Sequence, residues 1–334
     1  MKAVGYQESL PIDHPQSLVD IELPQPMAQG RDLLVDVHAV SVNPVDTKVR
    51  RGMAPAEGEW RVLGWDAAGV VRATGPDVSL FKPGDRVWYA GSIALPGSNS
   101  ELQLVDERIV GKMPESLDFP QAAALPLTSL TAWEMLFDRL EIKPGDSGKS
   151  ILIIGAAGGV GSIMVQLARQ LTNLTIIGTA SRPETQNWVK EMGAHHVINH
   201  HASLAEQLAE LTLQPDYVVS LTHTEKHIQQ IVEVIKPQGK FGLIDDPESF
   251  DIKLLKRKSL SLHWELMFTR ALYATEDMIQ QHKILNDLAK MVDDKTLRTT
   301  YTDNFGTINA DNLKRAHALI ESGRARGKIV LAGF

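Results

Sequence analysis

In the first third of the chain, hydrophobic positions fall in short runs that glycine and proline interrupt. The runs with the composition and spacing of β-strands lie at 33–42, 67–75, 84–91 and 101–114. This pattern predicts a β-rich barrel or sandwich for the amino-terminal part of the chain.

From Pro120 onward, helical and strand periods alternate. Helices are predicted at 121–140, 159–171, 276–293 and 311–321. Strands are predicted at 150–155, 174–179, 215–221, 239–245, 259–266 and 327–333. Such alternation is typical of an α/β fold with a parallel sheet and helices on both faces. The length of 334 residues also suggests two domains.

The turn after the first strand of this alternating region is rich in glycine and reads GAAGGVGS at 155–162. Ala156, Gly158 and Gly161 fit a variant of the dinucleotide-binding fingerprint that begins with alanine. Small residues let the backbone turn tightly and approach a pyrophosphate, whose charge meets the free N–H groups and the positive dipole end of the helix. The flanking strand and helix favour a nucleotide site over a turn that binds nothing.

An arginine follows the second strand of this region, where an acidic residue would commonly hold the adenosine ribose. Arg182 lies 21 positions after Gly161, Ser181 stands beside it, and the segment 175–182 contains no Asp or Glu. A carboxylate at this place binds the ribose hydroxyls and repels a 2′-phosphate, whereas an arginine accommodates the phosphate. Charge complementarity therefore favours NADPH over NADH, with a solvated surface arginine as the alternative.

Charge and composition exclude several classes of partner. The formal net charge of −7 at pH 7 gives no broad positive field for nucleic acid. No apolar stretch approaches the roughly 20 residues that span a bilayer, so no membrane partner and a cytoplasmic location are expected. The sequence has no cysteine, which excludes disulfides, thiolate catalysis and zinc sites with cysteine ligands.

Seven motifs, in order along nearly the whole chain, resemble the medium-chain dehydrogenase/reductase superfamily. Within it the chain is most similar to NADPH-dependent quinone oxidoreductases and the zinc-type alcohol dehydrogenase-like group. The motifs lie at 41–52, 63–75, 81–89, 124–136, 155–162, 192–200 and 320–331. The resemblance implies a GroES-like β-barrel domain (1–123 and 270–334) and an inserted Rossmann domain with a doubly wound parallel sheet (124–269). It also implies an active site between the two domains.

The resemblance further implies which residues hold the cofactor. Asn43 and Thr131 match positions that line its nicotinamide end. As alternatives, Asn43 could form a turn before Pro44, since asparagine readily bonds its own backbone, and Thr131 could be an ordinary helix residue.

By the same resemblance, a second group of residues meets the phosphates. The pyrophosphate loop is matched by Gly158, Gly159, Val160 and Gly161. Arg182, with Ser181 beside it, matches a residue that meets the 2′-phosphate, and His200 replaces a tyrosine near that phosphate. The alternative for His200 and its neighbour His201 is an exposed turn.

The zinc-ligand positions depart from the pattern of the zinc alcohol dehydrogenases. Their Gly-His-Glu motif reads Gly64-Trp65-Asp66 here, and both cysteine ligands are missing. Neither zinc can be bound in the usual way. The histidine pairs at 195–196 and 200–201 lie in the cofactor domain near the adenosine side, and the pair 223/227 shows no third ligand. No metal site is therefore expected.

Without a Lewis acid, the hydride acceptor must already be electrophilic, such as a quinone or the β-carbon of an enone. The candidate catalytic residues are Asn43, Lys48 and Asp66. The proton could come from Lys48, where quinone reductases often have tyrosine, from Asp66, or from solvent. Lys48 could instead be a solvated surface residue, and Asp66 could pair with a nearby cation. Trp65 belongs either to the wall of the site or to the core.

The apolar run Ser259–Leu266 is expected to be the last strand of the sheet. An open edge strand invites pairing, and relatives pair it with its counterpart in a second subunit. A homodimer is therefore expected, with an edge covered by the segment 269–274 as the alternative.

These features predict an NADPH-dependent reductase of small-molecule quinones or α,β-unsaturated carbonyls that needs no metal. A second hypothesis is a reversible alcohol or aldehyde dehydrogenase, against which the missing ligands argue. A third is an NADPH-binding protein without turnover, acting as a redox sensor or a structural protein. The cofactor motifs fit this third hypothesis as well, because Gly158 and Arg182 would serve binding and catalysis alike.

Overall fold

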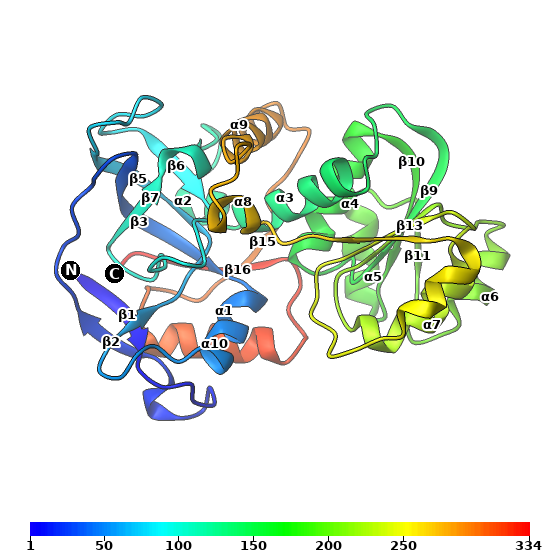
Figure 1. Ribbon diagram of the computed structural model, residues 1–334, viewed down its shortest axis with the longest axis horizontal. Coiled ribbons are helices and arrows are strands. Elements are labelled where there is room, and N and C mark those ends of the chain that lie inside the picture. Colours follow the sequence, from blue (N-terminus) through cyan, green and yellow to red (C-terminus); the bar gives the residue numbers. More distant parts are fainter. The chain divides into compact units, whose positions relative to one another are not determined.

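Residues 1–334 are all described by the computed structural model, and their packing divides them into two units (Figure 1). Unit 1 combines both ends of the chain, Met1–Leu130 and Phe268–Phe334, and unit 2 is the continuous segment Thr131–Met267. The division expected from the sequence, after residues 123 and 269, lies close to these limits.

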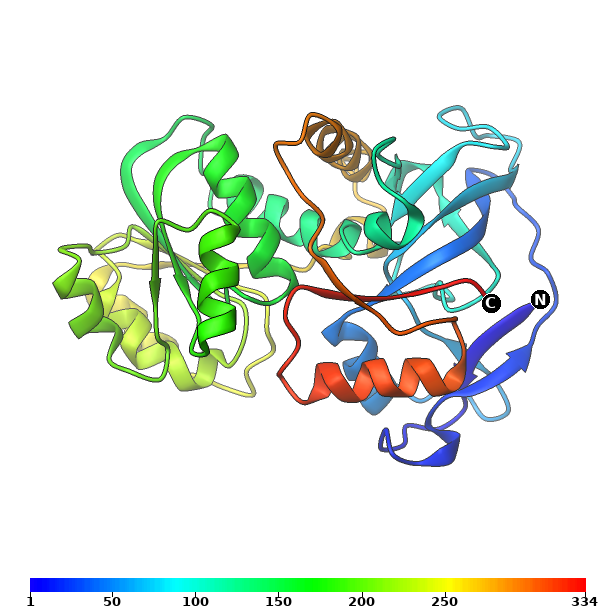
Figure 2. The same cartoon turned by 180° about the vertical axis from the view of Figure 1, so that it is seen from behind.

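Unit 1 contains two β-sheets. The larger has seven strands in the order β15-β16-β3-β5-β6-β8, with β7 paired to β3, and the smaller has the order β2-β1-β4. The strands are β1 (Lys2–Tyr6), β2 (Val19–Glu22), β3 (Asp32–Val42), β4 (Arg61–Val62), β5 (Ala67–Thr74), β6 (Arg86–Tyr89), β7 (Leu102–Asp106), β8 (Val110–Lys112), β15 (Tyr301–Asn304) and β16 (Lys328–Ala332). The late strand β16 pairs antiparallel with the early strand β3, so both ends of the chain build one sheet (Figure 2).

The helices of unit 1 pack around these sheets. They are η1 (Pro15–Ser17), α1 (Pro44–Gly52), η2 (Glu107–Ile109), α2 (Phe119–Ala123), α8 (Thr269–Leu272), α9 (Gln280–Asp293) and α10 (Ala310–Glu321), together with most of α3 (Pro126–Trp133). Helix α9 contacts β8, and α10 contacts α1. The core includes the fully buried rings of Tyr6, Trp65, Trp88 and Tyr89.

The long helix predicted at 121–140 is broken in the structure. It divides into α2, α3 and a π-helix, η3 (Glu134–Arg139). Pro126 opens α3, because proline lacks the N–H that a helix interior requires and its fixed φ suits a helix start. The apolar spacing predicted helical structure but not these breaks.

Unit 2 is a six-stranded parallel sheet in the order β11-β10-β9-β12-β13-β14. Its strands are β9 (Ser147–Ile154), β10 (Asn173–Thr179), β11 (His196–Ile198), β12 (Tyr217–Ser220), β13 (Lys240–Leu243) and β14 (Ser261–Trp264). Its helices after η3 are α4 (Gly159–Leu171), α5 (Pro183–Glu191), α6 (Leu204–Glu210), α7 (Thr224–Val234) and η4 (Ile252–Lys258). This is the doubly wound parallel sheet that the alternating pattern predicts, and β14 is an edge strand as predicted.

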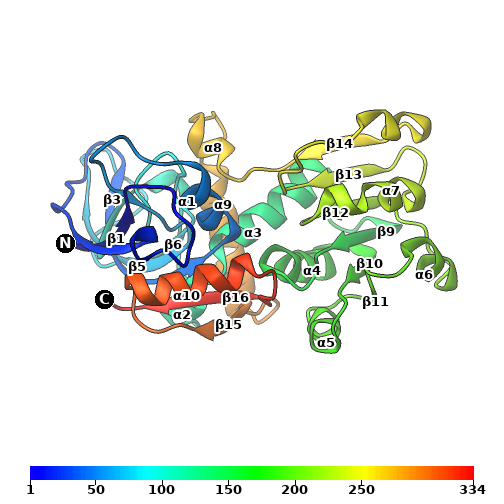
Figure 3. The same cartoon turned by 90° about the horizontal axis from the view of Figure 1, so that it is seen from below.

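The strand order of unit 2 reverses between β9 and β12, and this reversal locates a ligand site. The chain runs outward from β9 through β10 to β11, then returns to β12 and continues to β14. Right-handed crossovers therefore place α4 and α5 on one face and α6 and α7 on the other (Figure 3). Ligands of such sheets bind at the carboxyl ends of the strands, at the point of reversal. None of the helices in either unit is long and apolar enough to span a bilayer.

Candidate functional site

The glycine turn lies at this point of reversal, between the end of β9 and the start of α4. A Cβ at Gly161 would lie 2.5 Å from the Cα of Ala156, so only glycine lets α4 begin this close to the strand. A Cβ at Gly158 would meet nothing nearer than the Gly155 carbonyl oxygen at 3.5 Å, so the space beside Gly158 is open. With Gly159 and Val160, these residues form the first turn of α4, whose N–H groups have no partner within the helix. The turn therefore fits a pyrophosphate.

Ser181 and Arg182 follow β10, the strand beside β9. The Thr179 hydroxyl at the end of β10 accepts a hydrogen bond from the Gly155 N–H at 3.1 Å, which ties the end of β10 to the glycine turn. The Arg182 guanidinium is 41% exposed and pairs with Glu184 at 3.2 Å. An exposed ion pair of this kind contributes little, about 0–1 kcal/mol, so the guanidinium can exchange Glu184 for another anion at small cost.

His200 follows β11, on the other side of β10. Its ring centroid lies 4.5 Å from that of His201 and 6.1 Å from that of His227 on α7. Burial and the neighbouring histidines lower the pKa of His200 to about 4, so its ring is neutral at pH 7. His200 thus lies in a group of histidines, and its ring is more enclosed than the ring of a histidine in an exposed turn would be.

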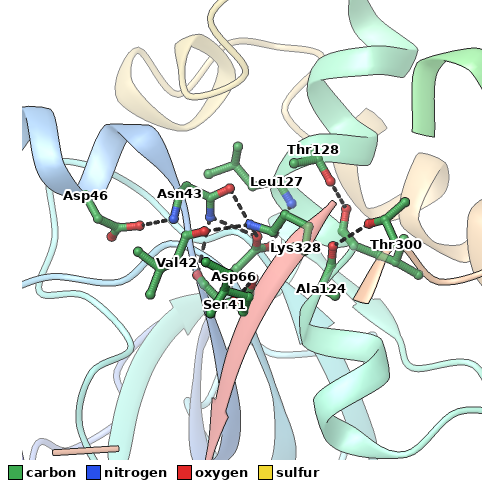
Figure 4. A network of polar contacts seen from close by, with 12 residues as sticks. Ser41, Val42, Asn43, Asp46, Asp66, Ala124, Leu127, Thr128, Thr300 and Lys328 are labelled. Carbon is green, nitrogen blue, oxygen red and sulfur yellow. Dashed lines mark hydrogen bonds and ion pairs between the residues drawn. The ribbon is translucent and has the colours of Figure 1, made fainter. Parts of the chain in front are cut away.

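In unit 1, a buried polar network joins the end of β3 to β5 and β16 (Figure 4). The Asn43 amide donates to Asp66 Oδ2 at 2.9 Å, and the Lys328 ammonium donates to the Asn43 amide oxygen at 2.5 Å. Lys328 Nζ also lies 3.0 Å from Asp66 Oδ2 and donates to the Val42 carbonyl at 3.1 Å. Asp66 and Lys328 are both buried, at 0% and 3% side-chain exposure, so the amide is held in one orientation.

The second oxygen of Asp66 is also occupied. Oδ1 accepts a hydrogen bond from the Leu127 N–H at 2.8 Å. Burial raises the pKa of Asp66, while the Lys328 ammonium and the hydrogen bonds oppose that shift. Asp66 therefore pairs with a nearby cation, which was the alternative to a role as proton donor. Both oxygens of its carboxylate have a partner inside the protein.

A second buried carboxylate, Asp46, supports the start of α1. It accepts hydrogen bonds from the backbone N–H of Asn43 at 2.6 Å and of Gly64 at 3.0 Å. Gly64 has a φ of +110°, and a Cβ there would lie 2.6 Å from the Ser98 hydroxyl, so this contact needs glycine. Complete burial raises the pKa of Asp46 to about 7. Asp46 thereby fixes the backbone on both sides of the network.

Lys48 and Thr131 are the two further candidate residues from the sequence. Lys48 is exposed on α1, five residues after Asn43, and Thr131 is a buried residue of α3 where unit 2 begins. The structure brings Asn43 and Asp66 together through a direct hydrogen bond.

The residues at the zinc-ligand motif do not fit a zinc ion. Trp65 is fully buried, donates from Nε1 to the Ser92 carbonyl at 3.1 Å and meets the Phe268 ring edge-on at 6.1 Å, so it belongs to the core. An indole offers no lone pair to a metal, and Asp66 already pairs with an ammonium group. No group of three or more His, Asp or Glu side chains in residues 1–334 has the arrangement of a metal site.

Sequence reasoning missed Lys328 and Asp46. Lys328 is the single charged residue of the apolar strand β16, and a buried charge in such a strand indicates a partner. Asp46 stands three residues after Asn43, the spacing of a helix capping box. Both signals were present in the sequence, but neither names the partner.

A buried carboxyl pair in unit 2 was also missed. Glu134 in the π-helix and Glu265 after β14 have 0% side-chain exposure and face one guanidinium, that of Arg139, at 3.9 and 2.7 Å. Burial and the neighbouring Glu134 raise the pKa of Glu265, so the pair retains a proton at neutral pH.

Family models match both units. The alcohol dehydrogenase GroES-like domain matches residues 29–115, and the family described as zinc-binding dehydrogenase matches residues 192–331. Both matches agree with the resemblance found in the motifs.

Individual proteins match over more of the chain. Zinc-type alcohol dehydrogenase-like protein SACOL2177 of Staphylococcus aureus (strain COL) is 41% identical over 99% of both chains. Human quinone oxidoreductase is 40% identical over 54% of this chain and 53% of its own length. A crystal structure from Rhizobium etli CFN 42, of a protein assigned as a zinc-dependent alcohol dehydrogenase, is 60% identical over 100% of this chain and 98% of that one, with a TM-score of 0.97.

Solved neighbours include complexes with a cofactor. The structure of mycobacterial Rv1454c complexed with NADPH is 25% identical over 99% of this chain and 100% of that one, with a TM-score of 0.83. The two family models and the full-length relatives agree with the fold. The chain therefore belongs to the medium-chain dehydrogenase/reductase superfamily of oxidoreductases, among its zinc-type alcohol dehydrogenase-like proteins.

Proposed function

We propose that the protein is an NADPH-dependent oxidoreductase that reduces a quinone or an α,β-unsaturated carbonyl without a metal ion. The observation that carries this proposal is the open glycine turn with Arg182 at the end of the neighbouring strand. The turn suits a pyrophosphate, and the guanidinium suits the 2′-phosphate that NADH lacks. The NADPH complex of Rv1454c supports the cofactor, and human quinone oxidoreductase supports the acceptor.

The acceptor follows from the donor groups around Asp66. An ammonium group and an indole stand where a zinc site would need ligands, so the substrate has to accept a hydride without a Lewis acid. Bound NADPH supplies the hydride, and the electrophilic carbons of quinones and enones can receive it. This reasoning favours these acceptors over the alcohol or aldehyde of the second hypothesis.

The buried network suggests separate roles for the candidate catalytic residues. Asp66 accepts hydrogen bonds at both oxygens and is fully buried, so in this proposal it positions Asn43 and does not give up a proton. Asn43 and Thr131 remain the proposed contacts at the nicotinamide end. Exposed Lys48 and water remain the candidate proton donors.

The first test compares NADPH with NADH in steady-state oxidation against a panel of small quinones and enones. We expect a preference for NADPH that a chelator leaves unchanged. Arg182→Ala should remove that preference, weakening NADPH binding by about 1–3 kcal/mol, as loss of a charge-assisted contact would. Lys190→Ala, which removes a charge from the exposed last turn of α5, is the matched control and should keep the preference.

Other outcomes each contradict one part of the proposal. Equal use of NADH would make Arg182 a surface residue, and loss of turnover with a chelator would require a metal site. Tight NADPH binding without reduction of any acceptor would favour the redox-sensor or structural hypothesis. Oxidation of alcohols with NADP⁺ would favour the dehydrogenase.

We also propose that the protein forms a homodimer through the edge strand β14 and its extension, Ser259–Leu266. Trp264 and Leu266 in this stretch are 51% and 52% exposed, which is unusual for large apolar side chains on an open edge. Trp264→Lys should shift the mass measured by light scattering from dimer to monomer. Trp60→Lys, at another partly exposed tryptophan, is the control and should leave the mass unchanged. A wild-type monomer would contradict this proposal.

A further inference from the structure

Four histidines lie at the carboxyl edge of the unit 2 sheet. The proposed contact between Arg182 and a 2′-phosphate does not explain why they lie together. His200 and His201 follow β11, and His223 and His227 lie at the start of α7; together they are called the histidine cluster. Ring centroids lie 4.5 Å apart for His200 and His201, and 6.1 Å apart for His200 and His227. Two segments of the chain about 25 residues apart thus bring imidazoles into one group.

The cluster borders the glycine turn. Thr222, directly before His223, lies 3.1 Å from the position that a Cβ on Gly155 would take. At the other end, the Ala180 N–H donates to the Ile198 carbonyl at 3.0 Å, which ties the segment leading to Arg182 to the one leading to His200. The cluster and Arg182 therefore share the edge of the sheet at which the adenosine end of a dinucleotide binds.

Two ring nitrogens in the cluster lack partners. Nδ1 of His200 and Nδ1 of His227 are enclosed by the protein and make no hydrogen bond within it. A buried polar atom without a partner is unfavourable and is found where a ligand, a water or a proton completes the site. The Nδ1 of His223, in contrast, is already 2.7 Å from the Thr222 hydroxyl.

Charged groups of both signs lie on the elements that carry or border these imidazoles. On α7, exposed Glu225 and Lys226 act on His227 in opposite directions. Asp245, which follows β13, is engaged by the N–H and the hydroxyl of Thr224. After β10, Arg182 adds a positive charge that Glu184 balances.

In this setting His200 and His227 stay neutral until an anion arrives. Burial, followed by repulsion from the other histidines, lowers the pKa of His200 to about 4 and also lowers the pKa of His227. A dianion beside these two histidines attracts their protonated rings. This attraction offsets the repulsion between the rings and raises the pKa values of both. The imidazoles then bind protons from the solvent.

We propose that the histidine cluster is part of the cofactor site and takes up protons from solvent when the 2′-phosphate of NADP(H) binds. The proposal rests on the proposed cofactor and adds His201, His223 and His227 to its recognition, beside His200. Arg182 then supplies a permanent positive charge, while the cluster supplies a charge that depends on pH. Affinity for NADP⁺ rises as pH falls, and affinity for NAD⁺, which lacks the phosphate, changes much less.

The test is calorimetric titration of the whole protein with NADP⁺ and with NAD⁺ at pH 7.5, in two buffers of different ionisation enthalpy. We expect proton uptake with NADP⁺ and much less with NAD⁺. By linkage, if binding takes up half a proton, the affinity for NADP⁺ falls about threefold for each unit by which the pH rises. Measurements between pH 7 and 8.5 stay above the second pKa of the phosphate itself, about 6.

The variant that tests the cluster is His200→Asn combined with His227→Asn. It should lose most of the proton uptake and flatten the dependence of NADP⁺ affinity on pH. His14→Asn in unit 1 is the control, because asparagine can still accept the hydrogen bond from the Gln16 N–H, and it should behave as wild type. If the double variant fails to fold, each single variant should lose part of the uptake.

Two results would overturn the inference while the proposed cofactor stands: tight NADP⁺ binding by wild type without proton uptake, or unchanged uptake in the variants. Failure of wild type to bind NADP⁺ would instead remove the proposed cofactor, and the inference with it. The two failures are thus distinguishable in one titration.

Discussion

Both units bury carboxylates, but they neutralise them by different means. In unit 1, Asp66 pairs with the buried ammonium of Lys328, whereas in unit 2, Glu134 and Glu265 share a proton beside the half-exposed Arg139. An ion pair fixes distance and orientation, and a shared proton can leave when the pH rises. The ion pair of Asp66 therefore fixes geometry, whereas the shared proton of unit 2, like the proton on Asp46 in unit 1, makes stability depend on pH.

The largest expected effect comes from removing the cation of unit 1. Lys328→Met leaves Asp66 buried without its partner and should lower the free energy of unfolding by about 3–5 kcal/mol, measured with urea. Lys328→Met combined with Asp66→Asn removes the unpaired charge and should recover part of the loss. A single variant as stable as wild type would show that the pair is not buried as described.

The pH dependence set by Asp46 is expected to be the next largest. Its pKa is about 7 in the folded state against 3.8 for an ordinary aspartate, so the folded protein holds a proton that the unfolded chain releases. Stability from this group is complete below pH 3.8 and is lost as pH rises to 7, by about 2–4 kcal/mol. Asp46→Asn should reduce the slope of unfolding free energy against pH in that window. If Asp46→Asn left the slope of unfolding free energy against pH unchanged, Asp46 would not be the group that holds this proton.

The smallest effect of a substitution is expected for Glu265→Gln in unit 2, at a pH where the carboxyl pair holds its proton. Glutamine resembles a protonated glutamate, so Glu265→Gln should change unfolding free energy at pH 5 by no more than about 1 kcal/mol. Because the pKa of Glu265 is raised by burial and by Glu134, wild type loses stability as pH rises from 4.5 to about 8, and the variant should lose less. If Glu265→Gln already lowered the free energy of unfolding strongly at pH 5, the pair would be ionised at that pH and held by Arg139.

Local signals in the sequence predicted the Rossmann unit well. Strand, glycine turn and helix are adjacent in the chain there, and α4 begins and ends at the predicted residues, Gly159 and Leu171. Side chains that act through distant contacts were not predictable in the same way. Lys328 meets Asn43 across 285 positions, and no periodicity encodes such a pairing. For Trp65 the sequence left two places open, and packing against Phe268 assigns it to the core.

The pairing of β16 with β3 has a consequence for how the protein is made. Unit 2 is one continuous segment, Thr131–Met267, and its sheet can be completed as soon as that segment has left the ribosome. Asp66 is synthesised before unit 2, and Lys328, which neutralises it, is synthesised after. If the GroES-like domain folded before Lys328 was made, it would bury the Asp66 carboxylate without its ammonium partner. We therefore expect this domain to complete its folding after the unit that interrupts it has been synthesised.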